Sequence, residues 1–285
     1  MKLIEHHSMD AFLQGTLAYL EQNEALNNLM LGICNRVKTI PEYYKEVYMV
    51  TVEASEDLIL AAVMTESQKL VVYSNKDEYN GAIELLVKDL QSKNRSIPGV
   101  VGSKELSQKA CDIWRKHHQC NIKLEMNMRV YELREVNKDM IGNGVFRVAG
   151  EEDLELVAQW VGDFEMDTGL NMKPDREKSY EMAKNRIQKK GIFLWEDEGK
   201  VVSMAAKARP TQNGCTVNLV YTPKELRGRG YAGSCVAALS QHLLDEGYQF
   251  CSLFTDLANP TSNSIYMKIG YKPVGDFDGY IIEGK

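Results

Sequence analysis

Apolar positions recur with helical spacing in the first 38 residues and alternate with polar positions in the segments that follow. Along residues 9–38 they fall on one side of a helix, with a break expected at Asn27 and Asn28. The alternating segments are rich in β-branched residues and are bounded by polar turns, which is typical of strands. The pattern through residue 133 predicts strands at 47–52, 58–64, 70–73, 99–102 and 122–133, and helices at 79–90 and 103–116.

A polar, weakly patterned segment at residues 135–144 ends in Gly-Asn-Gly and predicts a linker. It separates an N-terminal domain, residues 1–134, from a C-terminal domain, residues 145–285. In the C-terminal domain, the acidic run at 151–153 suits the first turn of a helix, because it complements the helix dipole. The pattern there predicts a strand at 145–148, a loop at 162–173, a helix at 180–187, and a hairpin of strands 192–195 and 201–208.

A strand, a glycine-rich turn and a helix follow one another directly in the C-terminal domain. The strand is expected at residues 217–221 and the helix at 231–244. Between them, Gly228 and Gly230 allow backbone angles that other residues avoid, and they keep side chains away from the peptide N–H groups. These N–H groups and the first turn of the helix form an anion site, to which two arginines of the turn add charged donors. A phosphorylated ligand is therefore expected.

This turn resembles the acyl-CoA-binding motif of the GNAT (Gcn5-related N-acetyltransferase) superfamily. The motif is Gln or Arg, two residues, Gly, one residue, and Gly or Ala, and the chain has Arg-Gly-Arg-Gly-Tyr-Ala at 227–232. The resemblance implies that the turn amides hold the CoA pyrophosphate, that the preceding strand offers backbone groups to the pantetheine arm, and that acetyl-CoA is the acyl donor. The cofactor-binding residues implied in this way are Leu219, Val220, Tyr221, Thr222, Arg227, Gly228, Arg229, Gly230, Tyr231 and Ala232.

The residues after the turn extend the resemblance. The superfamily has a strand, an Asn-containing loop, a short helix that bears a Tyr, and Gly-Phe or Gly-Tyr at the start of a last strand. The chain supplies these landmarks in order: a strand at 250–255, then Asn259, Asn263, Tyr266 and Gly270-Tyr271. The resemblance implies that Asn259 or Asn263 contacts the cofactor and that Tyr266 protonates the leaving thiolate. It covers the chain from about residue 145 to the C-terminus.

The N-terminal half has the same order of helices and strands, so the chain resembles a tandem GNAT protein with a degenerate first copy. The predicted fold class is α/β (α+β), with two GNAT-like domains, each a mixed, mostly antiparallel sheet flanked by helices. In the first copy the turn at residues 99–104 lacks the arginine and the alternating glycines of a pyrophosphate cradle. We therefore expect this half to supply an interface or part of the acceptor pocket rather than to bind CoA.

Composition and charge argue against nucleic-acid, membrane and metal partners. The net charge is −6 over 285 residues, which argues against a nucleic-acid partner. No apolar run reaches the roughly 20 residues that span a bilayer, and the N-terminus lacks the apolar core of a signal peptide. A cytoplasmic location without a membrane partner is therefore expected. The six cysteines have no zinc-like spacing, so we expect them to be reduced and expect no metal.

Transfer of an acyl group to an amine requires a base for the acceptor and donors for the developing oxyanion. The base candidates are Glu165 and Asp167, in the loop predicted after the first helix of this domain, and Glu196 on a neighbouring strand. If the first two line the pocket, they favour a cationic acceptor. The resemblance implies a backbone amide of the motif strand as the oxyanion donor, here the N–H of Val220 or Tyr221.

Several alternatives stay open at the level of sequence. The acceptor is either a small-molecule amine or a protein amine, and the oligomeric state, including a homodimer, is undecided. A non-catalytic acyl-CoA sensor with the same fold is the main alternative to an enzyme. Residues 228–233 also fit the GxGxxG pattern of dinucleotide-binding folds, but fewer than 60 residues follow the turn, too few to complete such a sheet.

Overall fold

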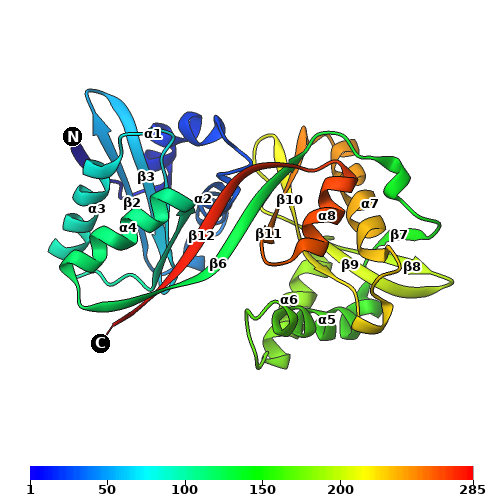
Figure 1. Ribbon diagram of the computed structural model, residues 1–285. Helices are drawn as coiled ribbons and strands as arrows, with labels where there is room; N and C mark the ends of the chain where they lie inside the picture. Colours follow the sequence, from blue (N-terminus) through cyan, green and yellow to red (C-terminus); the bar gives the residue numbers. More distant parts are fainter. Residues whose placement is uncertain (285) are drawn as a thin grey trace. The chain divides into compact units, whose positions relative to one another are not determined.

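The computed structural model describes residues 1–284, which form eight α-helices and twelve β-strands (Figure 1). These residues divide into two compact units. The first unit holds residues 1–130, 254–259 and 273–284, and the second holds residues 131–253 and 260–272.

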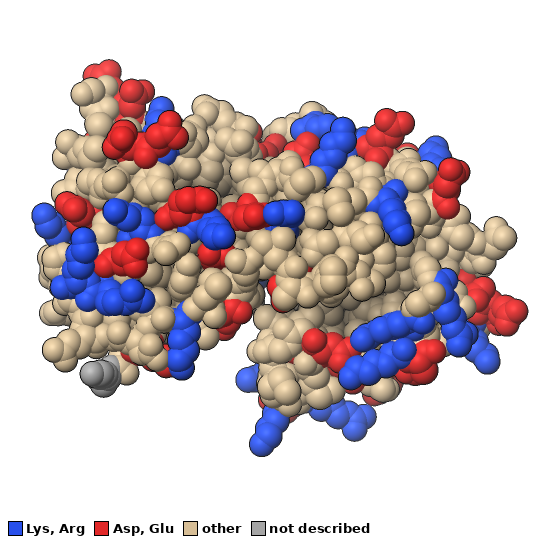
Figure 2. Space-filling model, viewed as in Figure 1, with Lys and Arg blue, Asp and Glu red and all other residues tan. Residues whose placement is uncertain are grey.

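No helix in the described part of the chain is both long and apolar enough to span a membrane. On the face that Figure 2 displays, basic and acidic side chains are interspersed.

The first unit is built on a mixed, mostly antiparallel sheet, as the sequence predicted. Strands β1 to β4 pair antiparallel in chain order, β5 joins β4 in parallel, and β12 joins β5 antiparallel. Figure 1 shows the red β12 alongside β6, its neighbour in the strand order. The strands are β1 (Lys2–Glu5), β2 (Val47–Ala54), β3 (Asp57–Thr65), β4 (Leu70–Tyr73), β5 (Gly99–Ser103), β6 (Cys120–Leu133) and β12 (Lys272–Gly284).

Two pairs of helices cover the two faces of this sheet, because successive strand residues point to opposite sides. The helices are α1 (Met9–Glu21), α2 (Asn28–Thr39), α3 (Asn80–Ser92) and α4 (Lys104–His117). Tyr48 and Val50 of β2 pack with α3 and α4, whereas Met49 packs with α1 and α2. The break predicted inside residues 9–38 is confirmed, and the side chain of Asn27 stabilises it by donating a 2.9 Å hydrogen bond to the Leu20 carbonyl.

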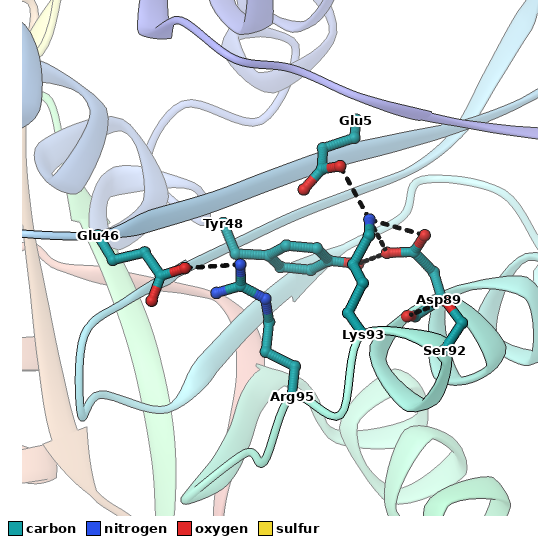
Figure 3. A network of polar contacts seen from close by, with 7 residues as sticks. All are labelled: Glu5, Glu46, Tyr48, Asp89, Ser92, Lys93 and Arg95. Atoms are coloured by element: carbon teal, nitrogen blue, oxygen red, sulfur yellow. Dashed lines mark hydrogen bonds and ion pairs between the residues drawn. The ribbon is translucent and has the colours of Figure 1, made fainter.

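A polar network fastens the end of α3 to the sheet of the first unit (Figure 3). The hydroxyl of Tyr48 donates a 2.7 Å hydrogen bond to Asp89, which also pairs with Lys93 at 2.6 Å. Lys93 reaches Glu5 of β1 at 2.9 Å, and Arg95 lies 5.1 Å from the centre of the Tyr48 ring. Burial and the neighbouring Asp89 raise the pKa of Tyr48, so its hydroxyl stays a donor.

The second unit repeats this architecture. Its strands are β7 (Val145–Val148), β8 (Ile192–Asp197), β9 (Lys200–Ala208), β10 (Gly214–Tyr221) and β11 (Phe250–Asp256). They are antiparallel neighbours in chain order, except that β10 and β11 pair in parallel. The helices α7 (Tyr231–Asp245) and α8 (Pro260–Ile269) cover one face, and α5 (Leu154–Asp167) and α6 (Arg176–Gln188) cover the other.

The helix α5 corrects one prediction. Residues 162–167 were expected to belong to a loop, but they form the last turns of α5. Gly162, where the loop is predicted to begin, lies inside α5 at a point where an added Cβ would lie 3.5 Å from the Pro174 side chain. The glycine thus allows the segment before α6 to pack closely, and Phe164 continues the apolar face toward the core between the two helices.

A further correction concerns the turn of the first unit that matches the glycine-rich turn. In the second unit, β10 pairs antiparallel with β9 and parallel with β11, and it leads into α7. In the first unit, β4 has the same relation to β3 and β5, and it leads into α3. The equivalent turn is therefore residues 74–79, not 99–104. It has no glycine, and the N–H of Asn75 is already bonded to the Tyr19 hydroxyl at 2.9 Å.

The segment predicted as a linker is ordered in this structure. It contains a short 3-10 helix (Lys138–Met140), and the N–H of Gly142 donates a 3.1 Å hydrogen bond to the Ser234 hydroxyl on α7. By its contacts the segment belongs to the second unit, together with the last three residues of β6. Residues 273–284 of β12 belong to the first unit.

Candidate functional site

The two parallel strands of the second unit, β10 and β11, stop pairing before either strand ends. Pairing between β10 and β11 covers three positions, and Thr216 opposite Ser252 is the last of them. The strand β10 nevertheless continues to Tyr221 and β11 to Asp256. The final five residues of β10 therefore lack a parallel partner, and their backbone groups on that side are candidates to bind an extended ligand arm.

A β-bulge lies in the same unpaired part of β10. The register with β9 shifts between Asn218 and Tyr221, and Leu219 has a positive φ of 50°, unusual for a residue with a side chain. Val217 packs with α7 and α8, yet Leu219, two residues later, packs with α5 and α6. In a regular strand both would share one face. The bulge thus reverses the alternation and re-aims the backbone of Leu219 and Val220.

A hydroxyl pair fixes the end of β10. The Ser203 side chain on β9 donates a 3.0 Å hydrogen bond to the Tyr221 carbonyl and lies 2.9 Å from the Thr222 hydroxyl. All three residues are buried. Ser203 was not among the predicted site residues, because a serine within an alternating strand carries no sequence signal for this role.

The glycine turn, residues 222–230, joins β10 to α7. It holds a short 3-10 helix (Lys224–Leu226) and then Gly228 and Gly230, whose φ values are 79° and 85°. An added Cβ would meet nothing within 4 Å at either glycine, so their positive φ, and not a lack of space, requires glycine. The turn therefore has the backbone freedom that the sequence argument required.

The first turn of α7 is open to a ligand. Gly230 occupies the N-cap position and provides no side chain to bind the free N–H groups, and the turn residues Gly228 to Gly230 are exposed. The hydroxyl of Tyr231 donates a 2.5 Å hydrogen bond to Asp197 at the end of β8, which anchors the start of the helix. Ala232 is half-buried beside it. Uncapped N–H groups at the positive end of a helix dipole favour an anion.

Arg227 is anchored to the turn at its base, although its side chain stays 47% exposed. Its Nε donates a 2.9 Å hydrogen bond to the Thr222 carbonyl, and its guanidinium lies 5.8 Å from the centre of the Tyr221 ring. Its Nη2 pairs with the carboxylate of Asp167, to which Lys224 also pairs at 3.0 Å. Arg229 is exposed as well.

Tyr266 lies on α8, on the same side of the sheet as α7. Its side chain belongs to the cluster that contains Val217 and against which Val220 and Tyr231 pack. It is 9% exposed, and burial raises its pKa to about 12. The hydroxyl therefore stays protonated at neutral pH and can act as a donor. No hydrogen bond of this hydroxyl occurs within residues 1–284.

The two predicted asparagines lie in different surroundings. Asn263 is buried one helical turn before Tyr266, and its Oδ1 accepts a 2.9 Å hydrogen bond from the Tyr131 hydroxyl. Asn259 is exposed in the connection between β11 and α8, where its N–H donates to the Asp256 carbonyl at 3.0 Å. By its contacts Asn259 belongs to the first unit, whereas Asn263 belongs to the second unit together with α7.

The three candidate bases differ in their partners. Glu196 accepts a 2.7 Å hydrogen bond from Arg147 and lies on β8, two strands away from β10. The paired Arg227 guanidinium lowers the pKa of Asp167, which makes this carboxylate a weaker base. Glu165 accepts a 3.3 Å hydrogen bond from Asn171 and has no ion pair among the described residues.

No three His, Cys, Asp or Glu side chains within residues 1–284 are grouped so that they could hold a metal ion.

Comparisons with known proteins agree with this architecture. A family model described as FR47-like protein matches residues 191–276, the segment that includes β10, the glycine turn, α7 and α8. The comparison with curated proteins gives no match. Solved structures match nearly the whole chain at low identity.

Three of these structures illustrate the likeness. The GCN5-related N-acetyltransferase from Sphaerobacter thermophilus has 15% identity and a TM-score of 0.62, over 98% of this chain and 94% of that chain. The GNAT-family acetyltransferase from Colwellia psychrerythraea has 15% identity and a TM-score of 0.56, over 100% of both chains. A tandem GNAT protein from the clavulanic acid biosynthesis pathway has 8% identity and a TM-score of 0.57, over 99% of this chain and 98% of that chain.

The TM-scores and the coverage of both chains show a common fold, although the identities are low. The chain has the fold of the GNAT superfamily, with two GNAT-like units, each a mixed sheet covered by helices on both faces. The predicted resemblance and fold class are thus confirmed. The roles of individual residues remain predictions.

Proposed function

We propose that the chain is an acyl-CoA-dependent N-acyltransferase that moves an acetyl group from acetyl-CoA to a primary amine within a ternary complex. The observation that carries this proposal is the junction of three features in one GNAT-like unit. A bulged β10 separates from β11, the glycine turn follows with two positive-φ glycines, and α7 begins without a side-chain cap. The two matching structures named as acetyltransferases support the same class.

The residues present fit the chemistry of an acyl-CoA. The N–H groups of the glycine turn and of the first turn of α7 would bind the pyrophosphate, with Arg227 and Arg229 as charged donors. The backbone groups of Leu219 to Tyr221 that face away from β9 would bind the amide-containing pantetheine arm as a strand-like partner. When bound, acetyl-CoA supplies an activated acyl group whose leaving group is a thiolate.

Tyr266 would hold the proton that the departing thiolate needs. Burial raises its pKa to about 12, so the hydroxyl is protonated at neutral pH, and its side chain lies in the apolar cluster against which Val220 of β10 packs. A backbone N–H of Val220 or Tyr221, re-aimed by the bulge, would stabilise negative charge on the acyl oxygen. In these roles the protein supplies a proton donor and an oxyanion donor from rigid elements.

The acceptor would be an amine, either a small molecule or a protein amine. Among the three candidate bases Glu165 is best suited, because Asp167 and Glu196 are engaged in ion pairs with arginines. The acidic side chains at the end of α5 also favour a cationic acceptor over an anionic one.

The experiment that tests this function is a thiol-release assay with acetyl-CoA and a panel of small primary amines and short peptides with free N-termini. We expect release of the CoA thiol that depends on the amine and that falls strongly in Tyr266→Phe. Binding of acetyl-CoA without thiol release from any amine would instead support a non-catalytic acyl-CoA sensor.

A further inference from the structure

Asp167 links the helix α5 to the glycine turn. It is the last residue of α5, and its carboxylate pairs with Lys224 at 3.0 Å and with the guanidinium of Arg227. Its side chain is 21% exposed, whereas those of Lys224 and Arg227 are 73% and 47% exposed, so solvent screens both pairs from the side of the cations. Both cations of the glycine turn that precede Gly228 are therefore paired with one carboxylate from a different element, which balances one of their two positive charges.

The position of this carboxylate is unfavourable for the helix itself. The last turns of α5 carry Asp163, Glu165 and Asp167, and no basic residue lies in the last turn. Negative charge at a helix C-terminus opposes the helix dipole. Lys224 and Arg227 offset this cost from outside the helix, so the end of α5 depends on cations of the glycine turn, one of which, Arg227, is a candidate donor to the pyrophosphate.

Arg227 is also constrained from its own side. Its Nε is bonded to the Thr222 carbonyl at 2.9 Å, which fixes the base of the side chain within the turn. The terminal nitrogens can then serve either Asp167 or an anion bound against the turn. A pyrophosphate carries more charge than one carboxylate and offers more acceptor oxygens, so it competes for the same donors.

We propose that Asp167 is an internal competitor of the CoA pyrophosphate: it holds Arg227 and Lys224 in the ligand-free protein and yields them when the donor binds. This inference rests on the proposed function. Binding of CoA then leaves the end of α5 without its cations. The loss of these ion pairs destabilises the last turn of α5 and so affects the segment between α5 and α6. In that segment Leu170 and Met172 are 61% and 73% exposed.

The exchange predicts an order of binding. The acidic end of α5 is covered by Lys224 and Arg227 until the donor takes them, so a cationic acceptor meets less competition after CoA has bound. By reciprocity, a cationic amine that binds near α5 must raise the affinity for CoA by the same factor as CoA raises the affinity for the amine. Asp167 thus sets both the donor affinity and the coupling between the two substrates.

The test is calorimetric titration of CoA into the full chain, the variants Asp167→Asn and Arg227→Ala, and their double variant. The control is Glu155→Gln, which removes a charge from the first turn of α5, where Glu155 is exposed and pairs loosely with Arg176 at 3.7 Å. We expect Asp167→Asn to bind CoA about fivefold more tightly, the range of one partly exposed ion pair. This increase in CoA affinity should be smaller when Arg227→Ala is also present. Glu155→Gln should bind CoA with the affinity of the unchanged protein.

Each outcome decides the matter. Equal or weaker CoA binding by Asp167→Asn would mean that the carboxylate only positions Arg227, and it would overturn this inference while leaving the proposed function intact. If Asp167→Asn raises the CoA affinity by the same factor with and without Arg227, the inference is also overturned. If no form of the protein, the unchanged chain included, binds CoA, both the inference and the proposed function fail.

Discussion

The hydroxyl of Tyr131 donates a 2.9 Å hydrogen bond to the side-chain oxygen of Asn263, and both residues are buried. This bond joins the last residues of β6 to α8, three residues before Tyr266 on the same helix face. The ring of Tyr131 also lies 6.5 Å from that of Tyr266. Tyr131 is thus part of the support that fixes the candidate acid.

Tyr131→Phe should lower the free energy of unfolding by about 1–2 kcal/mol, because the buried hydrogen bond from Tyr131 to Asn263 is lost. Urea denaturation would measure the loss. The matched control is Tyr248→Phe, since Tyr248 is only half-buried and its hydroxyl has no hydrogen bond among the described residues. If both variants unfold at the same urea concentration as the unchanged protein, the bond does not contribute to stability.

Gly230→Ala should weaken CoA binding and cost about 1–2 kcal/mol of stability, because φ is 85° at this residue and an L side chain is strained there. Since an added Cβ would meet nothing within 4 Å, steric contact does not account for the change. Titration with CoA and urea denaturation measure the two effects.

The control for this variant is Gly15→Ala, in the exposed face of α1, where an added Cβ also meets nothing within 4 Å. Alanine is favoured over glycine within a helix, so this change should stabilise the chain by about 0.5–1 kcal/mol and leave CoA binding unchanged. Equal CoA affinity in Gly230→Ala and Gly15→Ala would show that the glycine turn does not hold the pyrophosphate.

Tyr266→Phe should reduce kcat much more than it changes KM, because a proton donor acts in the transition state and not in substrate binding. The pKa of about 12 means that Tyr266 stays protonated up to about pH 11, so its ionisation should not lower kcat between pH 6 and 10. A pH–rate profile of the two proteins measures this. Unchanged kcat at saturating substrate would remove Tyr266 from the mechanism.

The same pKa shift makes a prediction for stability. An unfolded tyrosine ionises near pH 10, whereas folded Tyr266 keeps its proton to about pH 12, so the folded state binds more protons in this window. Stability should therefore fall as the pH rises from about 10 to 12, and Tyr266→Phe should make that fall less steep. An identical fall in both proteins would indicate that Tyr266 is not desolvated.

Much of the fold was predictable, because periodicity reports which face of each element is buried. The break at Asn27, the alternating strands and the helix after the glycine turn all follow from this rule. The strand β1 was missed because its sequence, Lys-Leu-Ile-Glu, places two adjacent apolar residues between charged ones and so does not alternate. The end of α5 was missed because Gly162 is used for close packing and not as a terminator.

The local chemistry of the site was less accessible from sequence. A glycine signals positive φ, so the glycine turn could be found, but Leu219 adopts a positive φ without such a signal, because the bulge is imposed by the packing of β10 on both faces. The pairing of Asp167 with Arg227 joins residues 60 positions apart. Only the packing of α5 against β10 brings them together.

The measurement that tests the central claim most directly is a thermal-shift titration of the full chain with acetyl-CoA, free CoA and NAD in parallel. A ligand at 100 times its dissociation constant stabilises the folded state by about 2.7 kcal/mol, enough for a visible rise in Tm. We predict a rise with both CoA compounds and none with NAD. An unchanged Tm with acetyl-CoA and CoA would contradict the assignment of the glycine turn as an acyl-CoA site, and the proposed acyltransferase function with it.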